Sequence, residues 1–365
     1  MILTIYKAEC GDAASIKYLG EDNCFHNIFF DAGFERTFHN ILFPVIETII
    51  QRNERIDCWI LSHIHSDHIG GILGYIDSIK RNEIPDVVDN WIYNPPRRIS
   101  NPLINKRVEL PVSEATSIRQ GDIIAAFLQK KGMLSDVDHI FPMPTLGFLG
   151  LDIEILSPDI ASLKKLRTKY KNSQISLNFD ETNSISLATS SNYSDHNIKL
   201  ENFSQGNTKA DTSVENRSSI ATVFTFNHYK ILWLSDSHES VVAAALKSKG
   251  ISYENPYQCD IMQVAHHASK GNSSPAFFAM ISCSKYIISA DGENNYGLPH
   301  KQCIANILCN DRRDFSVHYT IYFNYKTDII ENIFLIDDKD VFAKFNFSVC
   351  YPEEGKNSIE ILLNH

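Results

Sequence analysis

The sequence predicts an α/β fold in which strands and helices alternate along most of the 365 residues. Three observations support this prediction. Short runs of β-branched and aromatic residues alternate with segments that have the apolar spacing of helices. One continuous apolar run, residues 56–61, is typical of a fully buried strand and leads directly into a histidine-rich loop. A polar stretch over residues 159–217 interrupts the alternation, which then resumes.

In the first third of the chain, short runs bounded by Gly, Asp and Asn predict strands at residues 3–6, 14–19 and 27–30. Apolar spacing then predicts an amphipathic helix over residues 43–52. After the buried strand at 56–61 and its histidine-rich loop, a second helix is expected to begin at Gly70 and Gly71 and to reach Ile79.

The middle of the chain continues the pattern. A buried strand is expected at residues 91–93, a helix within 111–133 and a further strand at 148–156. Residues 159–217 are rich in Ser, Asn, Lys and Thr, which predicts an insertion that is partly helical at its start and flexible afterwards.

Beyond the insertion, the expected strands cover residues 220–226, 230–234, 260–265 and 286–290, and the expected helices cover residues 241–249, 275–281 and 301–308. The rest of the chain is expected to form further short strands, such as 316–324 and 333–336. We therefore expect a large domain over residues 1–310, with 311–365 as a C-terminal β extension that packs on the domain or continues it.

Composition favours a soluble globular protein, since 43% of the residues are hydrophobic and 21% are charged. No apolar run approaches the roughly 18 residues of a membrane helix, and the first residues lack the features of a secretory signal. The eight cysteines show no CxxC spacing, which favours reduced thiols. We expect a cytoplasmic protein without membrane contact.

The formal net charge of −10 disfavours a long, non-specific nucleic-acid surface, because such a surface needs clustered Lys and Arg. This charge does not exclude a nuclease.

The most informative motif is His63-x-His65-x-Asp67-His68, which follows the buried strand. A solvated loop gains nothing from three imidazoles and a carboxylate crowded together, whereas a bound cation accepts all their lone pairs. In an extended segment His63 and His65 point the same way and can share one ion, while Asp67 and His68 can reach a second ion beyond the turn. The motif predicts a two-metal site.

Other motifs follow in order along the chain: Gly11-Asp12-Ala13, Phe30-Asp31-Ala32-Gly33, Asn216-x-x-Ser219-Ile220, Leu232-Trp233-Leu234-Ser235-Asp236, Val264-Ala265-His266-His267-Ala268-Ser269 and Ile288-Ser289-Ala290-Asp291 through Asn295-Tyr296-Gly297-Leu298-Pro299-His300. With the histidine motif, they resemble the ComEC-type branch of the metallo-β-lactamase superfamily over residues 1 to 310, excluding the insertion. The resemblance implies a four-layer αβ/βα sandwich with a dinuclear metal site at one edge. It also implies hydrolysis with a metal-bridging hydroxide as the nucleophile.

The resemblance suggests the second half of the site. Asp236 is expected to bridge both ions, the alternative being a cap for the next helix. We assign His267 to the second ion and His266 to substrate phosphate or leaving-group contact, with the reverse assignment open. His300 can act as an acid or a phosphate ligand, unless it caps the helix that begins at Lys301. Asp67, His266 and His300 are thus the candidate catalytic residues, and His63, His65, Asp67, His68, Asp236 and His267 are the candidate metal ligands.

Two acidic residues are expected in supporting roles. Asp31 is expected to hold a histidine ligand through its second ring nitrogen, and Asp12 to shape the floor of the site. The sequence also departs from the family pattern, with Ala268 where relatives usually have Gly and Leu298 where they often have His.

The His63/His65 ion lacks an obvious third protein ligand. His139 precedes a Pro-rich turn, His196 lies in the polar insertion and His228 lies at a hairpin tip, so none is convincing. Zn²⁺ is the expected metal for both positions, with Mn²⁺ as the alternative.

Three functions remain open. The first is phosphodiester hydrolysis of DNA or another nucleic acid, for which the resemblance supplies the substrate and, through relatives in antiviral gene clusters, a role in bacterial defence. The second is hydrolysis of a small ester, lactone or phosphocholine-type phosphodiester. The third is a degenerate, non-catalytic binding subunit. A partner protein or a homodimer is compatible with each of them.

Overall fold

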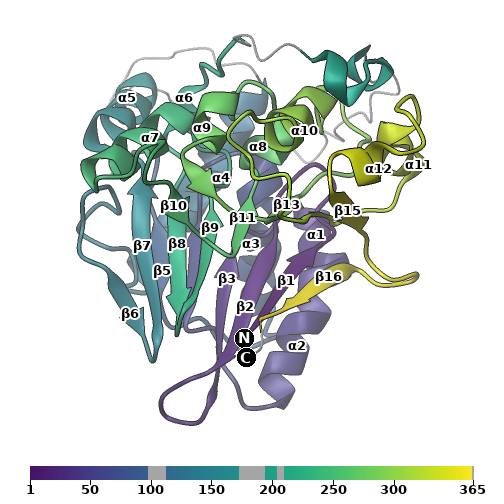
Figure 1. The fold of residues 1–365 in the computed structure, drawn as a ribbon. Helices are drawn as coiled ribbons and strands as arrows, with labels where there is room; N and C mark the ends of the chain where they lie inside the picture. The colour runs from purple at the N-terminus through teal and green to yellow at the C-terminus, as the bar shows by residue number, and fades with distance from the viewer. Residues whose placement is uncertain (98–111, 172–193, 204–208, 364–365) are drawn as a thin grey trace.

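A computed structural model of the chain describes residues 1–97, 112–171, 194–203 and 209–363. Two large sheets pack against each other, and helices cover the outer face of each (Figure 1). The predicted four-layer αβ/βα sandwich is therefore confirmed.

The first sheet has the strand order β16-β1-β2-β3-β4-β5. Its strands are β1 (Ile2–Tyr6), β2 (Ala14–Leu19), β3 (Phe25–Phe30), β4 (Cys58–Leu61), β5 (Trp91–Tyr93) and β16 (Ser358–Leu362). Strands β1, β2 and β3 form an antiparallel meander, whereas β3, β4 and β5 are parallel. The carboxyl ends of β1, β3 and β4 therefore lie at one edge of the sheet.

The second sheet has the strand order β15-β14-β13-β11-β9-β8-β7-β6. Its strands are β6 (Leu146–Phe148), β7 (Leu151–Ser157), β8 (Ala221–Phe226), β9 (Tyr229–Trp233), β11 (Ile261–Gln263), β13 (Lys285–Ile288), β14 (Tyr319–Phe323) and β15 (Phe347–Cys350). Strands β9, β11, β13, β14 and β15 are parallel, so their carboxyl ends also share an edge. A separate two-stranded sheet pairs β10 (Tyr257–Gln258) with β12 (Ile281–Ser282).

The helices are α1 (Glu35–Thr37), α2 (Phe43–Gln51), α3 (Ser66–Lys80), α4 (Val112–Lys130), α5 (Ile160–Tyr170), α6 (Val214–Arg217), α7 (Glu239–Ser248), α8 (Ala265–Ala268), α9 (Pro275–Phe278), α10 (Lys301–Leu308), α11 (Asp328–Glu331) and α12 (Val341–Lys344). A π-helical turn, η1 (Phe38–Leu42), joins α1 to α2, and three 3₁₀ turns are η2 (Ser194–Asn197), η3 (Leu200–Asn202) and η4 (Asn332–Phe334). Side chains of α2, α3, α4 and α5 pack on the first sheet, and those of α7, α9 and α10 pack on the second.

Strand β4 shows why the sheets stack in this way. All four of its residues are buried, because alternate side chains enter different layers. Trp59 and Leu61 pack with the helices, whereas Cys58 and Ile60 pack against the second sheet. A continuous apolar run is the pattern expected of a strand covered on both faces.

The C-terminal residues take part in both sheets. Strand β16 pairs with β1, and the two termini lie close together (Figure 1). Strands β14 and β15 continue the second sheet beyond β13.

Two local predictions need correction. Helix α3 begins at Ser66 rather than at Gly70, so Asp67 and His68 lie in its first turn. The close packing of the helix requires glycine here, because a side chain would have no room. A Cβ on Gly71 would lie 2.3 Å from the Ala32 carbonyl oxygen.

The expected strand at residues 333–336 is wrong. Residues 332–334 form the turn η4, and Leu335 is 77% exposed, so this apolar run does not enter a sheet.

The predicted insertion is helical at its start, as expected, since α5 covers Ile160–Tyr170. Residues 172–193 and 204–208 lie outside the described residues. The described parts between them and after them are packed: Leu200 is fully buried in the core, and Asp211 and Asn216 reach the site described below. All eight cysteines are described and none forms a disulfide. No helix in the described ranges is both long and apolar enough to cross a membrane.

A pH-dependent contribution to stability is expected near the start of β3 in the first sheet. His26 lies between two carboxylates, with Nδ1 2.6 Å from Asp57 and Nε2 2.9 Å from Asp22. Burial opposes protonation of His26, but the hydrogen bonds to Asp22 and Asp57 outweigh it and raise the pKa. A raised pKa means that this stabilisation is fully present below the unfolded-state pKa of about 6.5 and is lost as the pH rises through the folded-state value.

We therefore expect His26→Gln to lower the urea midpoint more at pH 5.5 than at pH 9. The exposed His39 is a matched position, and His39→Gln should show no such difference between the two pH values. An equal loss for His26→Gln at both pH values would contradict the assignment.

Candidate metal centre

The predicted site residues meet where loops from both sheets come together. They follow the carboxyl ends of β4, β9 and β11, where loops of α/β sheets commonly bind ligands. The residues in these loops are His63, His65, Asp67 and His68 after β4, Asp236 after β9, and His266 and His267 after β11.

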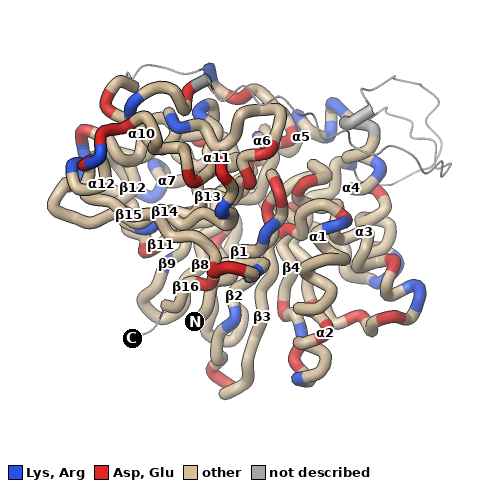
Figure 2. The backbone as a smooth tube through the Cα atoms, turned by 90° about the vertical axis from the view of Figure 1, so that its right-hand side faces the viewer, with Lys and Arg blue, Asp and Glu red and all other residues tan. Residues whose placement is uncertain are grey.

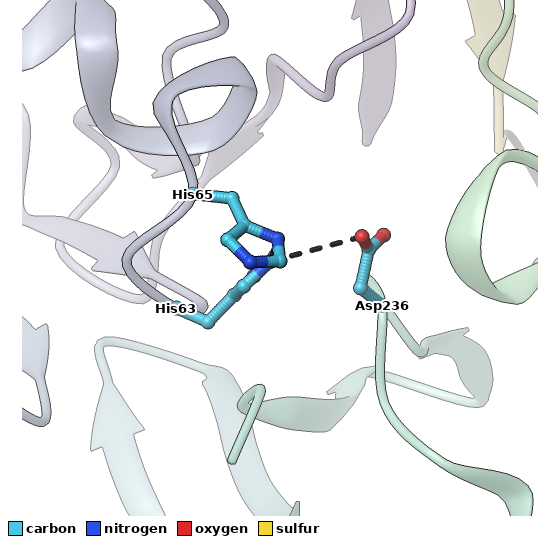
Figure 3. A group of neighbouring side chains, drawn as sticks. All are labelled: His63, His65 and Asp236. Atoms are coloured by element: carbon cyan, nitrogen blue, oxygen red, sulfur yellow. Dashed lines mark hydrogen bonds and ion pairs between the residues drawn. The ribbon is translucent and has the colours of Figure 1, made fainter. Parts of the chain in front are cut away.

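The first group able to hold a metal ion consists of His63, His65 and Asp236, and one ligand atom of each lies within 4.8 Å of the others. Figure 3 shows the two imidazoles on one loop facing the Asp236 carboxylate. Nε2 of His63 is 2.9 Å from Nδ1 of His65 and 3.7 Å from Oδ2 of Asp236. Two nitrogens and a carboxylate oxygen form a donor set that suits a divalent ion.

The second group consists of Asp67, His68 and His267. Oδ2 of Asp67 is 3.8 Å from Nε2 of His68 and 3.8 Å from Nε2 of His267. The Asp67 side chain is 24% exposed, whereas His68 and His267 are almost fully buried. The group is therefore enclosed by protein at its two histidines and accessible to solvent at Asp67.

Asp236 lies between the two groups. Its Oδ2 is 3.5 Å from Nε2 of His68 and 3.7 Å from Nε2 of His63, and its Oδ1 is 3.6 Å from Nε2 of His267. A buried carboxylate with oxygens near both groups has the geometry of a shared ligand. The alternative role as a helix cap is wrong, because α7 begins at Glu239 and its N-cap residue is His238.

Two of the imidazoles are oriented by acceptors on their second nitrogen. Nδ1 of His68 donates to Asp31 Oδ2 at 2.8 Å, and Nδ1 of His267 donates to the Ser289 carbonyl at 2.8 Å. Nε2 of each ring is buried and, within the described residues, has no hydrogen-bond partner. Buried polar atoms are costly without partners, and a cation would satisfy both nitrogens. These residues fit a divalent metal ion.

We expect Asp31→Asn to weaken metal binding about 10- to 100-fold. The Asp31 carboxylate accepts hydrogen bonds from the Ser62 amide and hydroxyl, both at 2.7 Å, as well as from His68. An amide in its place presents a donor to one of these groups and disturbs the orientation of His68. Competition with a chromophoric chelator measures the affinity. Asp77→Asn on α3, where the side chain is 45% exposed, is the control, and equal affinities for both variants would contradict the role of Asp31.

The electrostatics of the cluster favour a cation. Burial lowers the pKa of His63 well below its ordinary value, and the charge of His68 adds to the effect, so its lone pair is available at neutral pH. Burial alone would raise the pKa of Asp236, but His266 and His68 hold it well below its usual range. Burial also opposes the charge on His68, yet Asp236 raises its pKa well above the ordinary value. The buried Asp236 carboxylate thus stabilises positive charge on the neighbouring imidazoles. A bound metal ion can supply that positive charge in place of the protons.

The backbone around the site is strained. His266, His267 and Ala268 have φ values of 50°, 53° and 62°, and Asp31 and Ser235 have φ values of 47° and 48°. Left-handed non-glycine residues cost on the order of 1–3 kcal/mol each and cluster at functional sites. The conformation of Ala268 also explains why glycine would be favoured at this position.

His266 and His267 occupy different places. Nε2 of His267 belongs to the second metal-binding group, whereas Nε2 of His266 lies 3.7 Å from Asp236 Oδ2 and outside the groups of described residues. The His266 side chain is 26% exposed, and its pKa is raised to about 9, because Asp236 and Asp211 outweigh the effect of burial. This geometry brings His267, and not His266, into a group of described residues able to hold a metal ion.

His300 lies beside the His266 loop. Its backbone amide donates to the Ala268 carbonyl at 3.1 Å, and its Nδ1 accepts from the Lys270 amide at 3.4 Å. The side chain makes no capping bond to α10, where the Gln302 amide donates to Asp195 at 3.2 Å instead. Burial lowers the pKa of His300 to about 4, so a neutral ring with its proton on Nε2 is the form available near pH 7.

Asp12 lies beneath the second group. Its Oδ2 accepts from Gln263 Nε2 at 3.2 Å, its Oδ1 is 3.9 Å from Nδ1 of His267, and burial raises its pKa to about 6. The three other histidines considered for the third ligand lie elsewhere: His139 beside Asn94, His196 against the Pro299 carbonyl and His228 in the β8–β9 turn. Among the described residues, Asp236 is the residue grouped with His63 and His65.

Two polar residues near His266 were not predicted from the sequence. Asp211 comes from the polar segment before β8, and Asn272 comes from the loop after α8. Neither belongs to a recognisable metal-binding pattern. The nearest indication is the Asn216-x-x-Ser219 motif, because the Asn216 side chain donates to Asp211 at 2.7 Å.

No protein-family model and no curated protein match the sequence. Among solved structures, a mutant of the CmlA beta-hydroxylase has 9% identity and a TM-score of 0.39, with 99% of this chain and 54% of that chain covered. The chain thus spans about half the length of that protein. The metallo-beta-lactamase fold protein YhfI from Bacillus subtilis has 11% identity and a TM-score of 0.38, with 98% and 99% covered. A long form RNase Z from yeast has 13% identity and a TM-score of 0.34, with 78% and 36% covered. These likenesses are distant.

Proposed function

We propose that the chain is a metal-dependent hydrolase of the ComEC-like branch of the metallo-β-lactamase superfamily, which cleaves phosphodiester bonds in nucleic acid. The observation that carries this proposal is the position of Asp236, whose two oxygens lie 3.5–3.7 Å from imidazoles of both metal-binding groups. The motifs in the sequence support the family, and the substrate class follows from that resemblance.

In this proposal some residues would hold the cations and others would contact the substrate. His63, His65 and Asp236 would hold one divalent cation, and Asp67, His68 and His267 would hold the other. When bound, the two cations would neutralise the phosphate oxygens and lower the pKa of an attacking water. Asp67 and His266, at 24% and 26% exposure, lie on the open side and can contact that water or the phosphate. His300 can donate a hydrogen bond from Nε2 to a substrate oxygen.

A small phosphodiester is the second candidate substrate, and charge is the observation that favours it. The chain carries a net charge of −10. In Figure 2 positive and negative residues are interspersed over the face in view. Long nucleic acids bind through clustered cations that displace counterions, so a short or single phosphodiester needs less of such a surface.

Hydrolysis assays test the function and separate the substrates. We expect the purified protein with Zn²⁺ or Mn²⁺ to hydrolyse bis-p-nitrophenyl phosphate and to cleave plasmid or single-stranded DNA, and EDTA to abolish both activities. Hydrolysis of the small ester without cleavage of DNA would reject the nuclease and favour the small-substrate enzyme. Absence of bound metal together with absence of all hydrolysis would reject the enzyme and favour a non-catalytic subunit.

A further inference from the structure

A cluster of polar side chains lies on the Nδ1 side of His266, opposite the metal-binding groups. Nδ1 of His266 is 2.9 Å from Asn272 Oδ1 and 3.4 Å from Asp211 Oδ2, whereas Nε2 faces Asp236. We call Asp211, Asn216 and Asn272 the Asp211 cradle. Asn216 and Asn272 are 2% and 1% exposed, so the cradle is an internal structure rather than a solvated surface.

The Asp211 carboxylate is fixed by several donors. Its Oδ2 accepts from Asn216 Nδ2 at 2.7 Å and from Asn272 Nδ2 at 3.1 Å, and its Oδ1 accepts from the Ser213 amide at 2.8 Å. Burial opposes the charge, but hydrogen bonds with His238 and His266 keep the pKa of Asp211 below its ordinary value. Asp211 is therefore an anion that can only accept hydrogen bonds.

The backbone of Asp211 is docked against the loop that follows His267. The Asp211 amide donates to the Gly271 carbonyl at 3.0 Å. A Cβ on Gly271 would lie 3.0 Å from the Lys209 carbonyl oxygen and 3.2 Å from the Asp211 amide nitrogen. Glycine thus allows the close approach that brings the carboxylate to the imidazole.

Hydrogen-bond chemistry then determines the role of Nδ1 of His266. Because the Asp211 carboxylate only accepts, the NH₂ group of Asn272 must face it, and the Asn272 carbonyl oxygen must face the imidazole. Nδ1 therefore carries a proton and donates. Asn216 Nδ2 also lies 3.3 Å from Nδ1 and would suit an unprotonated nitrogen, but Asn272 Oδ1 is closer to Nδ1, at 2.9 Å, and Asn216 Nδ2 already donates to Asp211 at 2.7 Å.

We propose that Asp211 is a positioning residue, which holds the His266 ring through Asn272 with Nδ1 as a hydrogen-bond donor, so that Nε2 faces the candidate metal centre. The polar segment before β8 thereby becomes part of the site, although it supplies no metal ligand. The catalytic consequence of this orientation depends on the proposed hydrolase function, whereas the orientation itself does not.

The direct test is long-range ¹H–¹⁵N NMR of the Zn²⁺-loaded protein labelled in histidine, with the His266 signals assigned from His266→Gln. We expect a protonated Nδ1 in the wild type and a changed nitrogen pattern in Asp211→Asn, since an amide at position 211 lets Asn272 turn over. Asn272→Ala removes the nearer acceptor, at 2.9 Å from Nδ1, and should change the pattern less, because Asp211 Oδ2 remains 3.4 Å from Nδ1. Asp152→Asn, an exposed position on β7, is the control. An unchanged His266 pattern in Asp211→Asn would overturn the proposal.

A double-mutant cycle tests the consequence for catalysis. We expect Asp211→Asn to lower kcat about 10- to 100-fold with little change in KM, and to change kcat by about twofold at most when His266 is already alanine. Equal losses in both backgrounds would show that Asp211 acts without His266 and would overturn the proposal. A wild type without hydrolytic activity would reject the proposed function instead, and the NMR measurement would still decide the role of Asp211.

Discussion

Asp236→Ala is expected to lower kcat/KM for a chromogenic phosphodiester on the order of a thousandfold and to reduce the metal content below that of the wild type. The reason is that one side chain serves both halves of the site. Its oxygens lie 3.5–3.7 Å from Nε2 of His63, His68 and His267. The substitution therefore removes a ligand from each half and leaves buried imidazoles facing one another.

Elemental analysis and steady-state kinetics on the same preparations measure the two effects together. Asp236→Asn keeps the shape of the side chain and is expected to lose nearly as much activity, because a neutral amide cannot offset the charge of two cations. Asp152→Asn, at an exposed position on β7, should retain wild-type metal content and rate. Wild-type rates in Asp236→Ala at full metal occupancy would show that Asp236 is not the shared ligand.

The candidate ligands after β4 could be predicted from the sequence because they lie close together along the chain. His63, His65, Asp67 and His68 lie within six positions of one loop, and alternation in an extended segment already implies that the first two face the same point. The structure places Nε2 of His63 2.9 Å from Nδ1 of His65. The contribution of Asp211 was not predictable in this way, because only the fold brings it to His266.

The fold was predictable for a related reason. The continuous apolar run at residues 56–61 predicts a strand that is covered on both faces, and β4 is indeed buried along its whole length. The run at residues 333–336 has a similar apolar composition, yet it forms η4 and leaves Leu335 and Ile336 exposed. Composition alone does not distinguish the two, because a strand also requires a neighbouring strand with which to pair.

A buried ion pair lies directly behind the His300 loop. Lys301, which follows His300 and begins α10, is fully buried, and its Nζ lies 2.6 Å from Oδ2 of Asp337. The other oxygen of Asp337 accepts from the Leu200 amide at 2.7 Å. The pair thus connects three parts of the chain: the polar insertion, the first residue of α10 and the C-terminal residues.

Asp337→Ala is expected to lower the free energy of unfolding by about 3–5 kcal/mol, because it leaves the Lys301 ammonium buried without a counter-ion. Replacing both partners, as in Lys301→Met with Asp337→Leu, should recover most of this loss, since a buried apolar pair avoids the desolvation of two charges. Urea denaturation followed by circular dichroism measures each variant. Glu331→Ala breaks the exposed pair with Lys326, whose side chains are 42% and 55% exposed, and should cost at most about 0.5 kcal/mol. A similarly small cost for Asp337→Ala would mean that water reaches Lys301 and that the pair adds little to stability.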